Sequence, residues 1–225
     1  MDTLEQLKNQ PITLPMMRKT LYTAVICDAL DALGFRRQAL PVSFPPRTGM
    51  VRLAGRCKTT LWAETDWELP DPYELELLAV DTCFPDSVFI AAAGGSRRSG
   101  IWGELLSTAA ANRGCVGAIV DGAVRDVAAM TAMNFPVFSR AVSPCDSKDR
   151  QAVVDMDVPV TIEGLVFHPG DLVFADEDGI VVVPRAVEEE AVRRAWAKVH
   201  AESVARQAIR NGMKISEAYR QYGVL

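Results

Sequence analysis

Two short apolar runs that end in glycine, separated by a helix-forming segment, constrain the fold of this chain most strongly. The runs SVFIAAAGG (87–95) and CVGAIVDG (115–122) are as apolar as strands that are buried on both faces. Between them, ELLSTAAANR (104–113) is rich in helix formers, and Gly114 provides a stop. A strand–helix–strand connection is right-handed, so its two strands run parallel. The sequence therefore predicts an α/β fold built around a central parallel strand–helix–strand unit.

The remaining segments extend this unit in both directions along the chain. We expect helices over 13–33, 74–82, 125–133 and 187–212, strands over 51–62 and 135–144, and several short strands between 152 and 183. Residues 35–50 are rich in proline and are expected to form a loop. The short strands are joined by PGD and EDG turns, which favour antiparallel pairing beside the parallel unit.

The length and composition are those of an ordinary globular protein. The chain has 225 residues, of which 49% are hydrophobic and 24% charged, which fits a single domain over 1–225. The net charge of -5, with lysine and arginine spread along the chain, argues against nucleic acid as the main partner. No apolar run approaches the ~20 residues of a membrane span, and the polar segment MDTLEQLKNQ does not resemble a secretory signal. We therefore expect no membrane association.

The number and placement of cysteines and histidines indicate the redox compartment of the protein and limit the kinds of metal site that it can form. The cysteines are odd in number, scattered and mostly in apolar contexts: Cys27, Cys57, Cys83, Cys115 and Cys145. This pattern predicts a reduced, cytoplasmic protein. With only His168 and His200, a zinc site of several histidines is excluded. Any metal is then expected to be a hard cation bound by oxygen, such as Mg²⁺ or Mn²⁺.

Two polar motifs follow the glycine-ended runs and define a candidate site. Parallel strands end at the same edge of a sheet, where α/β proteins bind ligands. Glu104 begins the predicted helix, and the amides of Leu105 and Leu106 have no partner within that helix. Arg125 can hold a carboxylate with two hydrogen bonds, and Asp126 can hold a divalent cation.

A purely structural role for these residues is equally compatible with their types. Glu104 can be a helix-start acid, which is favourable by about 0.3–1 kcal/mol, and Arg125 and Asp126 can simply begin the next helix. Arg97 and Arg98 are expected on a solvated surface loop. Trp102 fits a pocket wall and plain core packing equally well. From the residues alone, both interpretations of the site stay open.

The chain resembles the RraA-like family at these and other segments. The matching segments are TAVICDALDALG, GELLSTAAANRGCVGAIVDGAVRD, NFPVFSRAVSP, HPGDLVFADEDGIVVVP and QAIRNGMKISEAYRQYGVL. That family includes class II pyruvate aldolases acting on 4-hydroxy-4-methyl-2-oxoglutarate and 4-carboxy-4-hydroxy-2-oxoadipate, and also the regulator of ribonuclease activity A. GELL followed by DGAVRD at this spacing is the most specific part of the resemblance.

The resemblance implies roles for the residues of the candidate site. Asp126 would bind Mg²⁺ or Mn²⁺, Arg125 would contact the pyruvyl group, and Glu104 would act on the metal through water. The amides of the two residues after Glu104 would hold the substrate carboxylate. The implied substrate-binding positions are Gly103, Leu105, Leu106 and Arg125. The resemblance further implies an αββα-type sandwich that assembles as trimers or hexamers, with the sites, the helix 187–212 and the tail at subunit interfaces.

The implied reaction is cleavage of a C–C bond of a 2-oxo acid through a pyruvate enolate, by retro-aldol cleavage or oxaloacetate decarboxylation. Such a metal-dependent lyase needs no Schiff base, which suits a site without an obvious buried lysine, since Lys58 lies on a different element. The aldolase motif has an acid three positions after the aspartate, and here Ala129 stands there. Two alternatives follow: a non-catalytic regulatory protein that binds a partner, and a metal-dependent enzyme of different chemistry on the same scaffold.

Overall fold

A computed structural model describes residues 11–49 and 52–224, and the segment MDTLEQLKNQ lies outside the described residues. The helices are α2 (Leu14–Thr20), α3 (Thr23–Ala32), α4 (Glu74–Asp81), α5 (Glu104–Asn112), α6 (Val127–Ala132), α7 (Glu188–Arg210) and α8 (Ile215–Tyr222), with a 3-10 turn η1 (Arg185–Val187). The strands are β1 (Leu53–Glu64), β2 (Ser87–Gly100), β3 (Ala118–Val124), β4 (Val137–Val142), β5 (Gln151–Met156), β6 (Val160–Ile162), β7 (Leu165–Phe167), β8 (Leu172–Ala175) and β9 (Ile180–Val183).

The centre of the fold is a mixed sheet. Within the described part of the chain it has seven strands, in the order β4-β3-β2-β1-β8-β9, with β5 paired to β1. Strands β1 to β4 are mutually parallel, while β5, β8 and β9 pair in antiparallel fashion. Strands β6 and β7 form a separate hairpin. The predicted α/β class is confirmed, and β2–α5–β3 is the predicted parallel unit.

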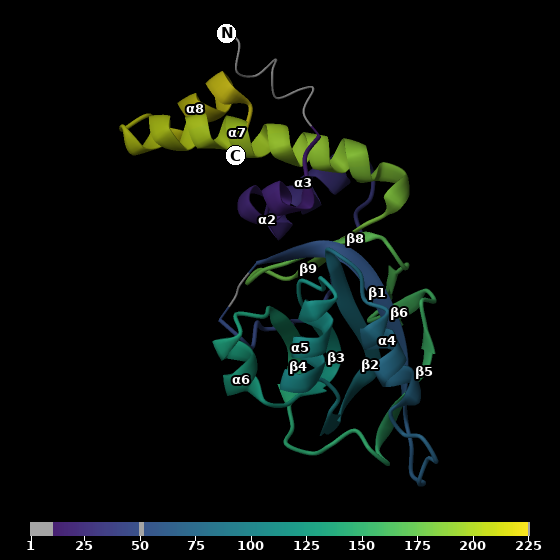
Figure 1. The fold of residues 1–225 in the computed structure, drawn as a ribbon. Coiled ribbons are helices and arrows are strands. Elements are labelled where there is room, and N and C mark those ends of the chain that lie inside the picture. The colour runs from purple at the N-terminus through teal and green to yellow at the C-terminus, as the bar shows by residue number, and fades with distance from the viewer. Residues whose placement is uncertain (1–10, 50–51, 225) are drawn as a thin grey trace.

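Strand β2 shows how the two faces of the sheet are buried. Phe89 and Ala91 point into a core shared with α4, α5 and α6, whereas Val88 and Ile90 point into a core shared with the β6–β7 hairpin. This alternation follows from the two-residue period of a strand. A third core lies where α2, α3 and α7 pack on β8 and β9, and Figure 1 shows these helices as a layer above that end of the sheet.

The predicted helix over 13–33 is wrong in one respect, because it is two helices. Leu21 and Tyr22 are extended and separate α2 from α3. The carboxylate of Asp176, in the β8–β9 turn, accepts hydrogen bonds from the amide (2.7 Å) and the hydroxyl (2.5 Å) of Thr23. A distant, buried side chain therefore caps the start of α3, and no local sequence pattern reveals such a partner.

Strand β2 is longer than predicted. Gly94 and Gly95 adopt positive φ values of 61° and 75°, and the strand continues to Gly100 with irregular pairing to β3. The two glycines thus produce an irregularity in the strand rather than its end. The C-terminal helix predicted over 187–212 is confirmed as α7, and a further helix, α8, follows it.

Two further findings concern membrane-spanning helices and the cysteines. Across residues 11–49 and 52–224, no helix combines the length and the apolar character needed to cross a bilayer. All five cysteines are free thiols, and three of them, Cys57, Cys83 and Cys115, are buried.

Candidate active site

The two polar motifs meet at the carboxyl edge of β2 and β3. After β2 the chain turns through Gly103 into α5, and after β3 it turns through Asp126 into α6. The amide of Arg125 donates to the carbonyl of Trp102 at 2.8 Å, which joins the two turns. The Oδ2 atom of Asp126 accepts a hydrogen bond from the backbone amide of Glu104, with an N–O distance of 3.3 Å. The parallel unit therefore brings together the residues that the sequence singled out.

The backbone of Asp126 directs its carboxylate toward α5. Asp126 adopts a left-handed conformation (φ 56°, ψ 32°), and its side chain forms no capping hydrogen bond with its own helix, α6. Aspartate adopts this left-handed region more readily than most other non-glycine residues. A Cβ atom on Gly103 would lie 2.5 Å from Asp126 Oδ2 and 3.1 Å from Arg125 Cγ. Glycine at position 103 therefore allows the carboxylate and the guanidinium to approach the start of α5.

Arg125 is held by a residue that sequence reasoning missed. Its Nη1 donates to Asp146 Oδ2 at 2.8 Å, and its Nε lies 3.8 Å from Asp126 Oδ2. Asp146 also accepts hydrogen bonds from the hydroxyl of Tyr73 (2.7 Å) and the amide of Lys148 (2.8 Å). Partial burial would raise the pKa of Asp146, but these three donors lower it to about 2. Asp146 is therefore a fixed negative charge that orients the guanidinium.

One signal could have pointed to Asp146. It lies four residues after the end of β4, and β4 is parallel to β3, so both strands end at the same edge of the sheet. Tyr73 comes from the turn before α4, and no local sequence pattern indicates that it contacts Asp146.

A buried carboxyl group lies behind this ion pair. Glu76 of α4 is only 6% exposed, and the hydroxyl of Ser147 donates to its Oε2 at 3.3 Å. Burial raises the pKa of Glu76 to about 7, despite the opposing effects of Ser147 and Arg125. The site therefore contains one group that titrates near neutral pH, next to Asp146, which does not.

The start of α5 presents both an acid and free amides. Glu104 Oε1 accepts a hydrogen bond from the hydroxyl of Thr108 at 2.8 Å, which leaves its second oxygen available. Leu105 and Leu106 occupy the first turn, and no described group accepts a hydrogen bond from either amide. The side chain of Leu105 is 77% exposed. An anion beside Arg125 would therefore meet unpaired N–H groups.

Other residues considered from the sequence have structural roles. Trp102 is buried, packs on Phe89 and donates its indole N–H to Ser107, so it is a core residue. Arg98 lies within β2 and not on the expected loop, but its ion pairs with Glu64 and Asp66 are exposed, so the expected solvated position is confirmed.

Lys58 lies on β1, a different element from the candidate site, as the sequence predicts. The side chain of Lys58 is 2% exposed, and its Nζ is held by Asp157 at 2.6 Å. Lys58 makes no hydrogen bond or ion pair to Arg125, Asp126 or Glu104 among the described contacts. The charge of this buried lysine is therefore paired with Asp157, outside the candidate site.

The oxygen donors of the site suit a hard cation that keeps much of its water. The described residues contain no cluster of three or more Asp, Glu, His or Cys side chains that could enclose a metal. Asp126 is half exposed, its Oδ1 accepts no described hydrogen bond, and Glu104 lies beside it. Mg²⁺ is usually held by one or two carboxylates together with water and substrate oxygens. Asp126 as the protein ligand, with Glu104 holding metal-bound water, fits this requirement.

Comparison with known proteins gives the family. The family model RraA-like, described as Aldolase/RraA, matches residues 23–182. Protein DlpA of Legionella pneumophila is 29% identical over 213 residues, which are 93% of this chain but only 34% of DlpA. A Halalkalibacterium halodurans protein named "Putative 4-hydroxy-4-methyl-2-oxoglutarate aldolase" is 30% identical over 202 residues, covering 89% of this chain and 90% of that protein.

A solved structure agrees with this comparison. Streptomyces coelicolor RraAS2, described as an unusual member of the RNase ES inhibitor RraA protein family, superimposes with a TM-score of 0.75 at 27% identity. The match covers 86% of this chain and 94% of RraAS2. This chain therefore belongs to the RraA-like family, as the family match, these relatives and the mixed α/β fold with its site at the sheet edge show.

Proposed function

We propose that this protein is a divalent-metal-dependent carbon–carbon lyase, of the class II aldolase or decarboxylase type, which cleaves a 2-oxo acid through a pyruvate enolate. One observation carries the proposal: Asp126, the Arg125 guanidinium and the free amides at the start of α5 converge at one sheet edge. Membership of the RraA-like family and the H. halodurans relative named as an aldolase support the reaction class.

Each residue has a proposed task that follows from its position. Asp126 would hold Mg²⁺ or Mn²⁺, and Glu104 would hold water bound to the cation. The amides of Leu105 and Leu106, reached across Gly103, would bind the substrate carboxylate. A bound cation would supply a Lewis acid at the keto group. Arg125, fixed by Asp146, would stabilise the negative charge that develops on the keto oxygen as the C–C bond breaks.

We also propose that the working form is a homo-oligomer, a trimer or hexamer, in the cytoplasm. The helices α7 and α8 leave apolar side chains exposed on a single protomer: Val204, Ile209, Ile215 and Tyr219. Covering these side chains with a neighbouring subunit would remove them from water. Sedimentation of the purified chain tests this, because a concentration-independent monomer would contradict it.

A second candidate function is a non-catalytic regulator, which would bind a partner rather than transform a substrate. Two observations favour it: Ala129, exposed at the start of α6, replaces the acid of the aldolase motif, and RraAS2 belongs to a family described as RNase inhibitors. A metal-dependent enzyme acting on a different bond is the third candidate, and Ala129 again supports it.

The test is production of pyruvate. Purified protein is mixed with Mg²⁺ or Mn²⁺ and, in separate reactions, 4-hydroxy-4-methyl-2-oxoglutarate, 4-carboxy-4-hydroxy-2-oxoadipate and oxaloacetate. Pyruvate is then followed with a coupled lactate dehydrogenase. We expect metal-dependent turnover that Asp126→Ala abolishes and that Asp155→Ala, an exposed carboxylate on β5, leaves unchanged. Pyruvate release no faster than in the Asp126→Ala protein, with every substrate, would refute the lyase.

A further inference from the structure

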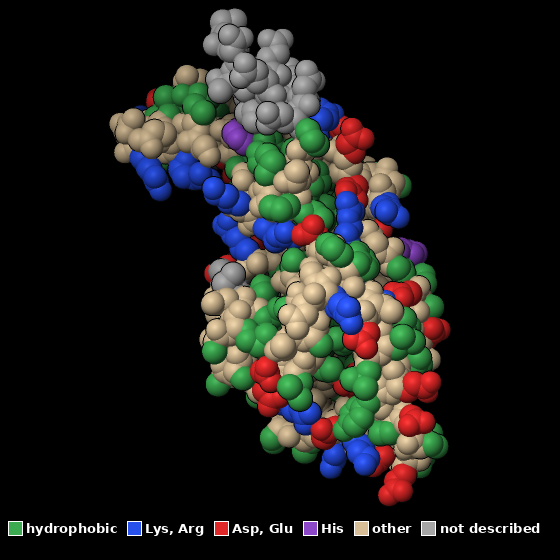
Figure 2. Space-filling model, viewed as in Figure 1, with side chains coloured by type: hydrophobic (Ala, Val, Ile, Leu, Met, Phe, Trp, Pro, Cys, Tyr) green, Lys and Arg blue, Asp and Glu red, His purple; other side chains and the backbone are tan. Residues whose placement is uncertain are grey.

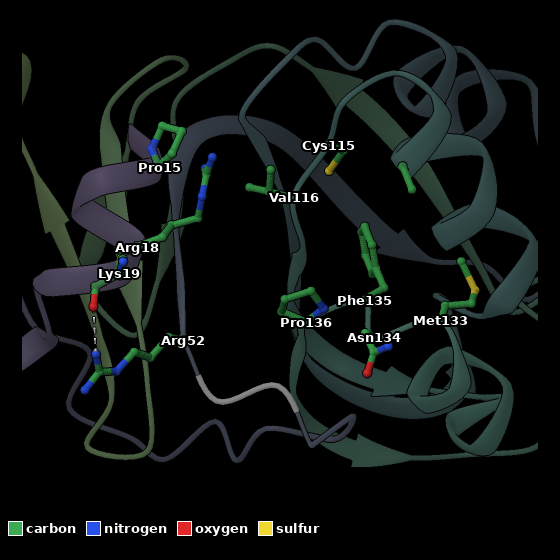
Figure 3. A pocket seen from close by; sticks show the side chains of 11 residues that line it. Pro15, Arg18, Lys19, Arg52, Cys115, Val116, Met133, Asn134, Phe135 and Pro136 are labelled. Carbon is green, nitrogen blue, oxygen red and sulfur yellow. Dashed lines mark hydrogen bonds between the residues drawn. The ribbon is translucent and has the colours of Figure 1, made fainter. Parts of the chain in front are cut away.

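The layer formed by α2, α3 and α7 overhangs the sheet, and lysine and arginine side chains gather along the overhang (Figure 2). Beneath it, a cleft with a volume of about 540 Å³ separates α2 from the C-terminal ends of α5 and α6. Figure 3 shows the cleft between two unlike walls. The basic wall comes from α2 and the residue before β1: Arg18, Lys19 and Arg52.

The basic wall carries charge that no carboxylate of the described residues neutralises. Arg18 already has partners within the protein, because its guanidinium donates to Asp86 Oδ1 at 2.5 Å and to the carbonyl of Ala54 at 2.9 Å. Lys19 and Arg52 are exposed, and neither lies within 4.0 Å of a carboxylate in the part of the chain that the structure describes. Two positive charges therefore remain available at one side of the cleft.

The opposite wall is mainly apolar, with the exposed amide of Asn134 as its polar side chain. Val116, Phe135 and Pro136 lie across the gap from Arg18, as Figure 3 shows, and Phe135 is only 5% exposed. Among the residues that the structure describes, no aspartate or glutamate lines the cleft. An occupant that satisfies both walls needs a negative charge on one side and an apolar body on the other.

We propose that this cleft binds a small organic anion with an apolar body, of the aryl or branched-chain carboxylate class. Its carboxylate would contact Lys19 and Arg52, and its apolar part would pack against Phe135 and Pro136. The volume lies in the range of about 300–1,000 Å³ that is usual for small-molecule sites. A salt-bridged carboxylate beside a buried apolar contact accounts for both walls of the cleft.

The cleft is distinct from the candidate active site. Ala111, which lines it, comes seven residues after Glu104 on α5, a distance of about 10 Å along the helix axis. A contact chain nevertheless connects the two places. Thr108 donates to Glu104 Oε1 at 2.8 Å and lies 3.5 Å from the sulfur of Met133, which lines the cleft. The proposal does not depend on the proposed lyase activity.

The test uses ¹⁹F NMR of 4-(trifluoromethyl)benzoate titrated with the full-length protein. Two matched probes separate the walls: 4-(trifluoromethyl)benzyl alcohol has the apolar body without the charge, and trifluoroacetate has the charge without the body. We expect saturable binding of the benzoate at least tenfold tighter than that of either control probe. Equal binding of the three probes, or none, would overturn the proposal.

Variants locate the binding. The double change Lys19→Met with Arg52→Met should weaken benzoate binding at least fivefold. The charge-matched change Arg193→Met with Arg194→Met, on an exposed face of α7, should leave binding unchanged, and so should Asp126→Ala. Loss of binding in Asp126→Ala would assign the anion to the other site and overturn the proposal. A second copy of the chain could instead fill the cleft. In that case benzoate will not bind, and the variant with Lys19→Met and Arg52→Met will sediment as a smaller species than the natural protein. This result would also overturn the proposal.

Discussion

The buried carboxyl group of Glu76 gives a quantitative prediction about stability and pH. Its pKa is raised by burial from an ordinary 4.5 to about 7. The folded protein therefore holds a proton between about pH 4.5 and 7 that the unfolded chain has released. Stability from this group is fully present below pH 4.5 and is lost as pH rises through 7. A shift of this size corresponds to about 3 kcal/mol.

Replacing Glu76 with glutamine keeps the size and the hydrogen-bond acceptor for Ser147 but removes the charge. Near pH 4 the variant and the natural protein should have similar stability, because Glu76 is then protonated. At pH 8 the variant should be more stable by about 3 kcal/mol, since it no longer buries a carboxylate. The gain should develop mainly between pH 4.5 and 7.

The assay is urea unfolding at fixed protein concentration from pH 4 to 9, with the free energy of unfolding of the two proteins subtracted at each pH. Subtraction removes the contributions of titrating groups that do not interact with Glu76. Glu74→Gln, an exposed acid on the same helix, serves as the control and should show no such trend. A stability difference that does not change with pH, or that favours the natural protein at pH 8, would refute the argument.

Two further substitutions test how the site is built. Gly103→Ala should reduce kcat/KM in the pyruvate assay at least tenfold, because its Cβ would lie 2.5 Å from Asp126 Oδ2; activity like that of the natural protein would show that this close approach is not needed. Tyr73→Phe removes the hydrogen bond to Asp146, so Arg125 should be held less firmly, and kcat should fall several-fold with little change in the melting temperature measured by circular dichroism. An unchanged kcat would limit Tyr73 to a structural role.

The parallel unit and the meeting of its two loops could be predicted because their causes are local. The buried runs and the handedness of the connection are sufficient to bring the start of α5 beside Asp126, although both strands continue past the glycines that were expected to end them. The break at Leu21 and Tyr22 could not be predicted, because the apolar pattern runs on through it and the cap comes from Asp176, more than 150 residues away.

The contacts that hold Arg125 in place also could not be predicted from local sequence patterns. Arg125 is oriented by Asp146, and Asp146 is bound in turn by Tyr73, so the network joins three separate elements. The ion pair that buries Lys58 could not be predicted for the same reason, since its partner Asp157 lies 99 residues further along the chain. Patterns of spacing identify residues on one element, whereas partners on distant elements emerge only from the folded arrangement.

The central claim is that Asp126 and the neighbouring donors together bind a divalent cation and a small 2-oxo acid. Calorimetric titration with oxalate, a stable mimic of the pyruvate enolate, tests it most directly. With Mn²⁺ present, oxalate should bind with a stoichiometry near one per chain, and binding should weaken at least tenfold without the metal or in Asp126→Ala. Oxalate binding that is indifferent to Mn²⁺, or that persists in Asp126→Ala, would contradict the account.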